Sequence, residues 1–213
     1  MARSKSSRRW LDRHVNDSYV ARARQLGYRS RAAFKLLALQ EKDRILMPGD
    51  RVVDLGAAPG GWSQVAVSLT GSSGQVIAVD RLAMDPLPGV VCVTGDFLDE
   101  AVMGELERVL AGAPVDVVLS DMAPNISGVA VVDQARATAL GEMALDCAKR
   151  WLKPGGNLVI KAFQGAGFDG LLWVMRQMFR SVVVRKPLAS RSASRECYLV
   201  GRRFLGDPDA VTV

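Results

Sequence analysis

The sequence predicts an α/β protein built on a Rossmann-like, doubly wound sheet of seven strands, mostly parallel with the last strand antiparallel. From residue 50 onward, short apolar runs alternate with helical segments, which is the pattern of consecutive strand–helix units. The runs are continuous and rich in β-branched residues, as in strands covered on both faces. The last two runs are joined by only about nine residues, too few for a helical crossover, so we expect them to pair antiparallel. The predicted strands are 51–56, 75–80, 90–95, 115–121, 157–163, 181–187 and 196–204.

Before the first strand, the segment "DRHVNDSYVARARQLGYRSRAAFKLLALQEKDRI" predicts two helical pieces separated at Gly27. In the second piece, helical spacing directs Phe34, Leu37 and Leu36 towards the core. Lys35 then points away from that face, towards solvent or a cleft.

Length and composition predict one domain over 1–213, with 49% apolar residues. We divide it into a basic, mobile lead (1–17), a helical segment (18–49), the α/β core (50–204) and a tail (205–213). No run of 18 apolar residues and no secretory apolar core is present, so we expect no membrane association, although the basic start would also suit an organelle transit peptide. Three widely spaced cysteines predict no zinc site, no disulfide and a cytoplasmic location. We expect a monomer.

Charge is distributed unevenly along the chain. Residues 1–35 hold ten Lys/Arg and two acids, and residues 176–203 hold eight Lys/Arg and one acid. The middle, 36–175, holds ten Lys/Arg and seventeen acids. Basic ends around an acidic core favour a polyanionic partner, above all nucleic acid, over a surface that only aids solubility.

A glycine-rich turn, "VVDLGAAPGGWSQ" (52–64), joins the first strand to a helix. Helix N-termini offer free N–H groups, and glycines let the backbone approach a ligand. No Gly-Lys-Ser/Thr follows, so the turn is not a phosphate loop. Gly56, Gly60 and Gly61 also miss the dinucleotide spacing, which leaves dinucleotide binding as a weaker alternative.

Three acids, Asp54, Asp80 and Asp96, are predicted at the carboxyl ends of neighbouring strands. Such a site suits a ligand that is not strongly anionic, for example S-adenosylmethionine, which carries a sulfonium and no phosphate. The alternative to ligand binding is that acids near strand ends cap helices, as Asp99 or Asp133 could.

Two further strands end in polar residues: Asp121 ends the fourth and Lys161 lies near the end of the fifth. Glu196 begins the antiparallel seventh strand, so it belongs to the same edge, where ligands bind in open α/β sheets. Singly, Lys161 could be a lysine that extends to the surface. Together with the two acids, and with Lys35 on the preceding helix, a catalytic site is the better interpretation.

These residues carry a resemblance to the FtsJ/RrmJ family of ribosomal RNA 2′-O-ribose methyltransferases, over about Ser18 to Phe204. "YRSRAAFKL", "DLGAAPGGWSQ", "DMAPNISG", "LVIKAFQG" and "SRECYLV" resemble its successive motifs. The resemblance implies S-adenosylmethionine as cofactor. It places the family's Lys-Asp-Lys-Glu tetrad on Lys35, Asp121, Lys161 and Glu196, and its cofactor contacts on Gly60, Trp62, Asp80, Asp96 and Asp121.

In this family a ribose 2′-hydroxyl is methylated, and the resemblance makes Lys161 the proton acceptor. Burial and a second cation, Lys35, favour a neutral amine, whereas Asp121 and Glu196 favour the ammonium. Lys161 could therefore instead orient the hydroxyl or stabilise developing negative charge.

The resemblance implies ribosomal RNA as partner, specifically a uridine in the A loop of the large subunit, within an assembled ribosomal particle. We expect the basic ends to bind its phosphates, which position a strand without reading bases. The alternatives are an RNA cap 2′-O-methyltransferase, a non-catalytic RNA-binding assembly factor and a dinucleotide-dependent reductase. The predicted RNA-binding residues are Arg22, Arg24, Arg29, Arg31, Arg191 and Arg195.

Overall fold

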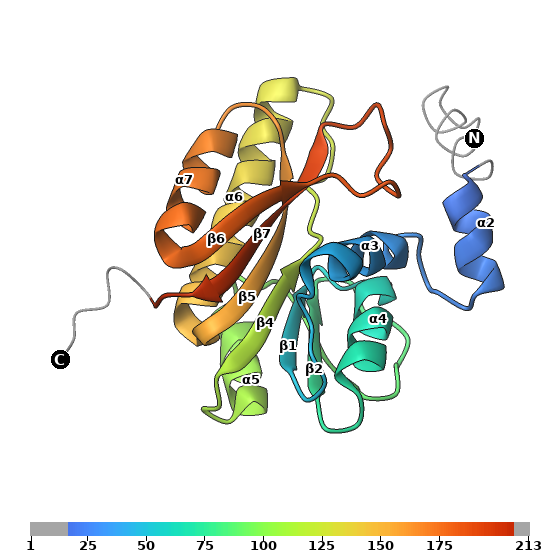
Figure 1. The fold of residues 1–213 in the computed structure, drawn as a ribbon, viewed down its shortest axis with the longest axis vertical. Coiled ribbons are helices and arrows are strands. Elements are labelled where there is room, and N and C mark those ends of the chain that lie inside the picture. Colours follow the sequence, from blue (N-terminus) through green and yellow to red (C-terminus); the bar gives the residue numbers. More distant parts are fainter. Residues whose placement is uncertain (1–16, 207–213) are drawn as a thin grey trace.

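The computed structural model describes residues 17–206 and contains the predicted α/β architecture (Figure 1). Of the predicted lead and tail, only Asp17, Leu205 and Gly206 fall within this range. In chain order the elements are α2 (Ser18–Gln25), α3 (Ala33–Asp43), β1 (Arg51–Leu55), α4 (Gly61–Thr70), β2 (Gln75–Asp80), β3 (Val90–Thr94), α5 (Glu100–Leu110), β4 (Val115–Ser120), α6 (Ala130–Trp151), β5 (Leu152–Phe163), α7 (Phe168–Met178), β6 (Phe179–Arg185) and β7 (Glu196–Phe204).

The strands form one seven-stranded sheet in the order β3-β2-β1-β4-β5-β7-β6. The neighbours from β3 to β5 pair parallel, and β7 pairs antiparallel with both β5 and β6, which confirms the predicted topology. In Figure 1 the arrows of β4 and β7 accordingly point in opposite directions. The end of β4 and the start of β7 therefore lie at the same edge.

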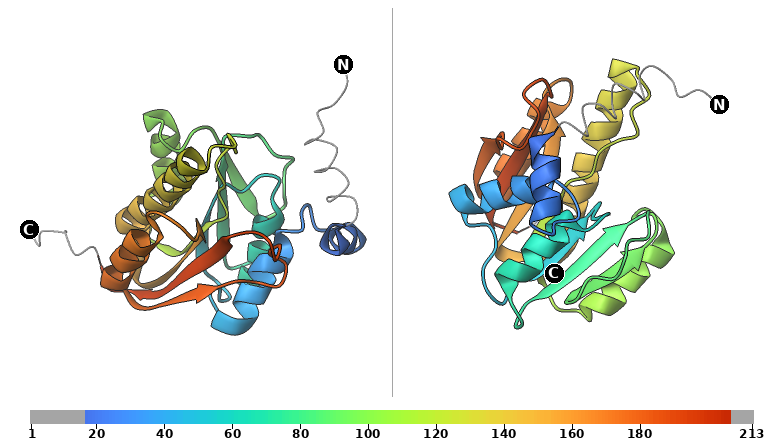
Figure 2. Two further views of the ribbon diagram at one scale, coloured as in Figure 1. Left: turned by 90° about the horizontal axis from the view of Figure 1, so that it is seen from above. Right: turned by 90° about the vertical axis from the view of Figure 1, so that its right-hand side faces the viewer.

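Helices cover both faces of the sheet. Buried residues of α5, α6 and α7 form one apolar cluster with the sheet, and those of α3 and α4 form a second cluster on the other face. The right-hand view of Figure 2 shows α4 and α5 on opposite sides of the sheet. None of the helices within 17–206 is long and apolar enough to cross a bilayer.

The N-terminal helices are separated as predicted, with Gly27 in the left-handed region at φ 74°. In α3, Phe34 and Leu36 are buried and Leu37 is half-buried. Lys35 does not extend into solvent, since only 11% of its side chain is exposed. α2 lies beyond α3, at the margin of the molecule (Figure 1).

Two predicted strands have clearly different bounds in the structure. β6 spans Phe179–Arg185 instead of the predicted 181–187. β5 begins at Leu152, five residues before the predicted start at 157. Leu152 pairs with Val115 of β4, and a register shift follows before Asn157 pairs with Val117. The intervening "KPGG" forms a bulge, because four residues of β5 lie opposite the single β4 residue Asp116 and Gly155 adopts φ 85°.

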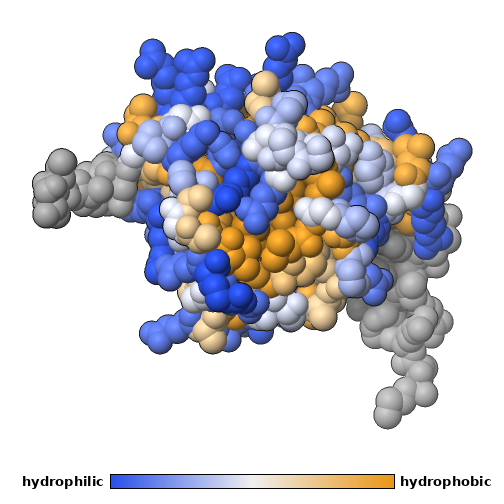
Figure 3. Space-filling view, turned by 90° about the horizontal axis from the view of Figure 1, so that it is seen from below, coloured by the Kyte–Doolittle hydropathy of each residue, from blue (hydrophilic) through white to orange (hydrophobic). Residues whose placement is uncertain are grey.

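An apolar area lies in the middle of the face seen from below the view of Figure 1, surrounded by hydrophilic residues (Figure 3). The arrow of β4 points away from this face in Figure 1, so the area is remote from the carboxyl edge of the sheet. The site described below lies at that carboxyl edge.

Asp54 is a fully buried acid near the end of β1. Its Oδ2 accepts a hydrogen bond of 2.7 Å from the Ser63 hydroxyl of α4, while Oδ1 has no partner within residues 17–206. Burial, together with the nearby carboxylates of Asp121 and Asp80, raises the pKa of Asp54 to about 7 against the effect of the Ser63 hydrogen bond. Asp54 thus ties α4 to β1, and its second oxygen is buried without a hydrogen bond from residues 17–206.

This raised pKa gives folding a measurable pH dependence. Between the ordinary carboxyl pKa of 3.8 and about 7, the folded protein binds a proton that the unfolded chain has released, so stability must fall as pH rises through this window. We expect Asp54→Asn to remove this dependence. As pH rises across the window, the free energy of unfolding of wild type should fall relative to that of Asp54→Asn by up to about 1.4 kcal/mol per pH unit.

Denaturant unfolding at several pH values between 4 and 8 measures the difference. Asp146→Asn is the matched control, because Asp146 is exposed on α6. A difference between Asp54→Asn and wild type that stays constant with pH would show that Asp54 is ionised throughout.

Candidate active site

Side chains from four separate elements meet at the carboxyl edge of the sheet. Asp121 directly follows β4, and Lys161 lies opposite Tyr198 in the β5–β7 pairing. Glu196 is the first residue of β7, and Lys35 comes from α3. Lys161 faces the α3 side, because Val159, two residues earlier, packs in the cluster that contains α3 and α4.

The four predicted tetrad residues form two buried ion pairs. Lys161 Nζ lies 3.0 Å from Asp121 Oδ1 and donates to the Asp121 backbone oxygen at 2.6 Å. Lys35 Nζ lies 2.7 Å from Glu196 Oε1. The four side chains are 7–14% exposed, so water screens these contacts weakly.

Tyr198 links the two pairs, and the sequence analysis missed it. Its hydroxyl donates to Asp121 Oδ1 at 2.7 Å and lies 3.4 Å from Glu196 Oε1. Burial, followed by the charges of Asp121 and Glu196, raises the pKa of Tyr198 well above its usual value, so the hydroxyl remains a donor. The available signal was spacing: Tyr198 is two residues after Glu196, hence on the same face of β7.

Ser190, in the loop before β7, is a second missed residue. Its hydroxyl donates to Glu196 Oε1 at 2.7 Å. Although burial works to raise it, the pKa of Glu196 is lowered by the charges of Lys35 and Lys161 and by this hydroxyl. Glu196 is thus held as a carboxylate, close enough to Lys161 to feel its charge.

The glycine-rich turn lies beside these ion pairs and is fastened by Asp80. Asp80 Oδ2 accepts from the Ala58 N–H at 2.9 Å, and Oδ1 accepts from the Leu82 N–H at 2.8 Å. Gly60 precedes α4 with φ 105°, a conformation that side chains disfavour. The turn therefore presents the N-terminus of α4, whose first N–H groups have no partner inside the helix.

The two remaining predicted cofactor residues, Asp96 and Trp62, differ in exposure: Asp96 is partly exposed and Trp62 is buried. Asp96, after β3, has a side chain that is 35% exposed and an Oδ2 atom 3.4 Å from Arg81 Nε. The indole of Trp62 is buried in the core, where its Nε1–H donates to the Ala32 oxygen at 2.8 Å and its ring packs on Tyr198. At Trp62 the backbone in the first turn of α4, and not the indole, is the part available to a ligand.

The alternative role for acids near strand ends was helix capping. Asp99 stands at the N-cap of α5 without a side-chain cap hydrogen bond. Asp133 lies inside the first turn of α6 and binds the N–H groups of Ser127 and Gly128. Asp54, Asp80 and Asp96 all precede these positions and cap neither helix with their side chains.

Two of the six predicted RNA-binding arginines are bound within the protein. The Arg29 guanidinium donates to the backbone oxygens of Pro59, Asp85 and Pro86 at 3.3, 2.7 and 2.7 Å. Arg31 pairs with Asp17 and donates to the Ala189 oxygen. These two side chains fasten the N-terminal segment to the turn and to the loop before β7.

The other four arginines are exposed: Arg22, Arg24, Arg191 and Arg195. The Arg22 guanidinium lies over the Phe34 ring at 4.9 Å, and Arg191 Nε lies 3.9 Å from Asp17 Oδ2. The structure thus brings the tetrad together. It places these four arginines on the surface of the N-terminal helical segment and of the loop between β6 and β7, the segments that lead to Lys35 and Glu196 of the tetrad.

Comparison with known proteins matches this arrangement to a family. The family model described as FtsJ-like methyltransferase matches residues 28–204, which include the tetrad and the turn. The chain is 59% identical to ribosomal RNA large subunit methyltransferase E of Azoarcus sp. (strain BH72), over 94% of this chain and 98% of that protein. It is 56% identical to the protein of the same name from Pseudomonas aeruginosa PAO1, over 97% and 100%.

Among solved structures, a ribosomal RNA methyltransferase from Plasmodium falciparum superposes with a TM-score of 0.77 at 29% identity, over 84% of this chain and 100% of that chain. Fold, sequence and site agree on one conclusion. The chain is a methyltransferase and belongs to the FtsJ-like methyltransferase family.

Proposed function

We propose that the protein transfers a methyl group from S-adenosylmethionine to a ribose 2′-hydroxyl of ribosomal RNA. The observation that carries the proposal is the buried Lys161 amine, which is held by Asp121 beside the Lys35–Glu196 pair. The substrate follows from the relatives, which are named as ribosomal RNA large subunit methyltransferases. The resemblance further supports a uridine of the A loop in an assembled large-subunit particle, and a monomeric cytoplasmic enzyme.

The acids around the turn fit S-adenosylmethionine better than a dinucleotide. Asp121 and Asp80 lie near enough to Asp54 to raise its pKa, so the turn is surrounded by mutually repelling carboxylates. A pyrophosphate would add to this repulsion, whereas an ammonium and a sulfonium would relieve it. The N-terminus of α4 suits the cofactor's carboxylate.

When bound, S-adenosylmethionine supplies an electrophilic methyl carbon attached to its sulfonium. We assign ribose hydroxyls of the cofactor to Asp80 and the remaining cofactor contacts to Gly60, Trp62, Asp96 and Asp121.

We assign proton acceptance to Lys161. A neutral amine has two N–H groups and one lone pair. Asp121 offers two oxygens to Nζ, its Oδ1 and its backbone oxygen, and these suit the two N–H groups. The lone pair then faces the substrate hydroxyl, and the resulting ammonium lies between Asp121 and Glu196, which stabilise it.

In this proposal Lys35 and Glu196 help to position the substrate. Glu196 offsets the charge of Lys35, so Lys35 is not the free repelling cation that the sequence suggested. The pair, with the Tyr198 hydroxyl, fixes the wall against which the ribose is aligned with the methyl group. A cap 2′-O-methyltransferase would use the same tetrad, but the relatives' names favour ribosomal RNA. The complete tetrad disfavours a non-catalytic assembly factor.

We expect Lys161→Ala to lower the methyl-transfer rate by at least about 10²-fold, the low end for loss of an acid–base group. Lys161→Arg should be nearly as inactive, because a guanidinium stays protonated. The measurement is single-turnover methylation of ribosomal particles with saturating cofactor.

The arginine variant separates two roles for Lys161. A lysine that only supplies positive charge would be partly rescued by arginine. Cofactor affinity should survive in both variants, which shows that the site is intact. Near-wild-type rates for Lys161→Ala would remove Lys161 from the chemistry.

For the cofactor we expect Asp80→Asn to weaken S-adenosylmethionine binding by about 1–3 kcal/mol, because a hydroxyl loses its charged acceptor. The amide oxygen still accepts one backbone N–H, so the turn is disturbed less than by alanine. Isothermal titration measures the dissociation constant. Asp85→Asn, an exposed change in the loop after β2, is the control. A folded Asp80→Asn variant that binds as tightly as the control would exclude Asp80 from the site.

A further inference from the structure

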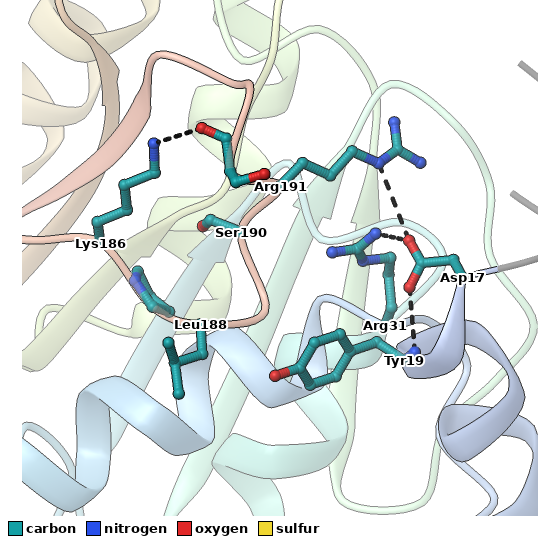
Figure 4. A pocket seen from close by; sticks show the side chains of 9 residues that line it. Asp17, Tyr19, Arg31, Lys186, Leu188, Ser190 and Arg191 are labelled. Carbon is teal, nitrogen blue, oxygen red and sulfur yellow. Dashed lines mark hydrogen bonds and ion pairs between the residues drawn. The ribbon is translucent and has the colours of Figure 1, made fainter. Parts of the chain in front are cut away.

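A cavity of about 490 Å³ lies behind the Lys35–Glu196 pair. Its walls come from the start of α2, from Arg31 and from the loop before β7 (Figure 4). The volume lies in the range of about 300–1,000 Å³ that is usual for small-molecule sites. Neither the tetrad nor the glycine-rich turn lines it, so the chemistry proposed above leaves this cavity without a use.

The lining combines positive charge with apolar and aromatic surface. Arg31, Lys186 and Arg191 contribute three cations against one acid, Asp17. Tyr19 and Leu188 lie next to each other along one side, and Arg191 extends along the other (Figure 4). A flat base could pack on the first pair while a phosphate meets the guanidinium.

Of the three cations, Arg191 is the one available to a ligand. Arg31 is bound to Asp17 and to the Ala189 oxygen. Lys186 donates to the backbone oxygens of Ser192 and Ser194 at 3.3 and 2.7 Å. The Arg191 side chain is 43% exposed, and its only close contact within residues 17–206 joins Nε to Asp17 at 3.9 Å.

A single side chain connects this cavity with the active site. Ser190 lines the cavity, is 7% exposed, and donates to Glu196 Oε1 at 2.7 Å. The same oxygen accepts from Lys35 at 2.7 Å. Whatever occupies the cavity therefore lies directly beside the wall of the proposed ribose site.

We propose that this cavity binds one nucleotide of the RNA strand next to the methylated nucleotide, with its base on Tyr19 and Leu188 and its phosphate on Arg191. The proposal rests on the proposed function, because it deepens the RNA substrate of the same site. An unpaired nucleotide fits this lining, since single-stranded RNA is bound by stacking and by backbone charge. An acidic segment of a ribosomal protein is the competing occupant, which the experiment below separates.

The first measurement is RNA binding as a function of salt. The probe is a single-stranded oligouridylate, with wild type, Arg191→Gln and Arg176→Gln compared by fluorescence anisotropy. Arg176 is exposed on α7, in the opposite helical layer, and removes the same charge. Losing one phosphate contact should reduce the slope of log affinity against log salt by about 0.7 in Arg191→Gln and leave it unchanged in Arg176→Gln.

The second measurement is kcat/KM for methylation of ribosomal particles. Leu188 is 89% exposed, so Leu188→Asp changes the cavity wall without opening the core. We expect kcat/KM to fall by about fivefold or more, because the base loses its apolar platform. S-adenosylmethionine affinity should stay within about twofold, the margin expected where no direct contact changes. Leu205→Asp, 61% exposed after β7, is the matched control and should behave as wild type.

If wild type methylates no ribosomal RNA, the proposed function fails, whatever the cavity does. If wild type is active but Arg191→Gln and Leu188→Asp match their controls, the nucleotide site is refuted. A loss of activity on particles with an unchanged salt slope on the oligouridylate would assign the cavity to a protein segment and would also overturn the proposal.

Discussion

The active site depends on the carboxylate of Asp121, whose Oδ1 receives both the Lys161 amine and the Tyr198 hydroxyl. Lys161 and Tyr198 lie opposite each other on β5 and β7, and Asp121 emerges from β4 beside them. Side chains from three neighbouring strands or their ends thus converge on one oxygen atom. Because side chains alternate along strands, a one-residue slip of β5 against β7 would move Lys161 to the other face and dissolve the site.

The electrostatics of the cluster follow from its composition. Two lysines and two carboxylates are nearly buried in direct contact, so their charges cancel within the cluster. Removing one charged member leaves its partner buried and unpaired, which is costly. The surrounding protein adds neutral donors, because Tyr198 donates to Asp121 and Ser190 donates to Glu196 without adding charge. In the proposed reaction, a proton accepted by a neutral Lys161 amine brings the cluster to this balanced state.

Much of this arrangement could be predicted from the sequence. Continuous β-branched runs located the strands, and polar residues at their ends located the tetrad, because parallel strands end at one edge. The early start of β5 could not be predicted, since Lys153 to Gly156 pattern as a turn and only the pairing of Leu152 with Val115 of β4 extends the strand beyond them. Tyr198 was not identified because, in the sequence, it is one more residue of an apolar strand. Charge counting also cannot separate Arg29, which binds three backbone oxygens, from exposed Arg191.

The central claim is that this cluster methylates a ribose of ribosomal RNA, and it can be tested in the cell of origin. The measurement is a map of 2′-O-methylation across ribosomal RNA from cells with the gene, without it, and without it but supplied with the Tyr198→Phe or the wild-type protein. We predict that one large-subunit position loses its methyl group on deletion and regains it fully with wild type, but more slowly with Tyr198→Phe, which no longer bridges Asp121 and Glu196. An identical map with and without the gene would contradict the account.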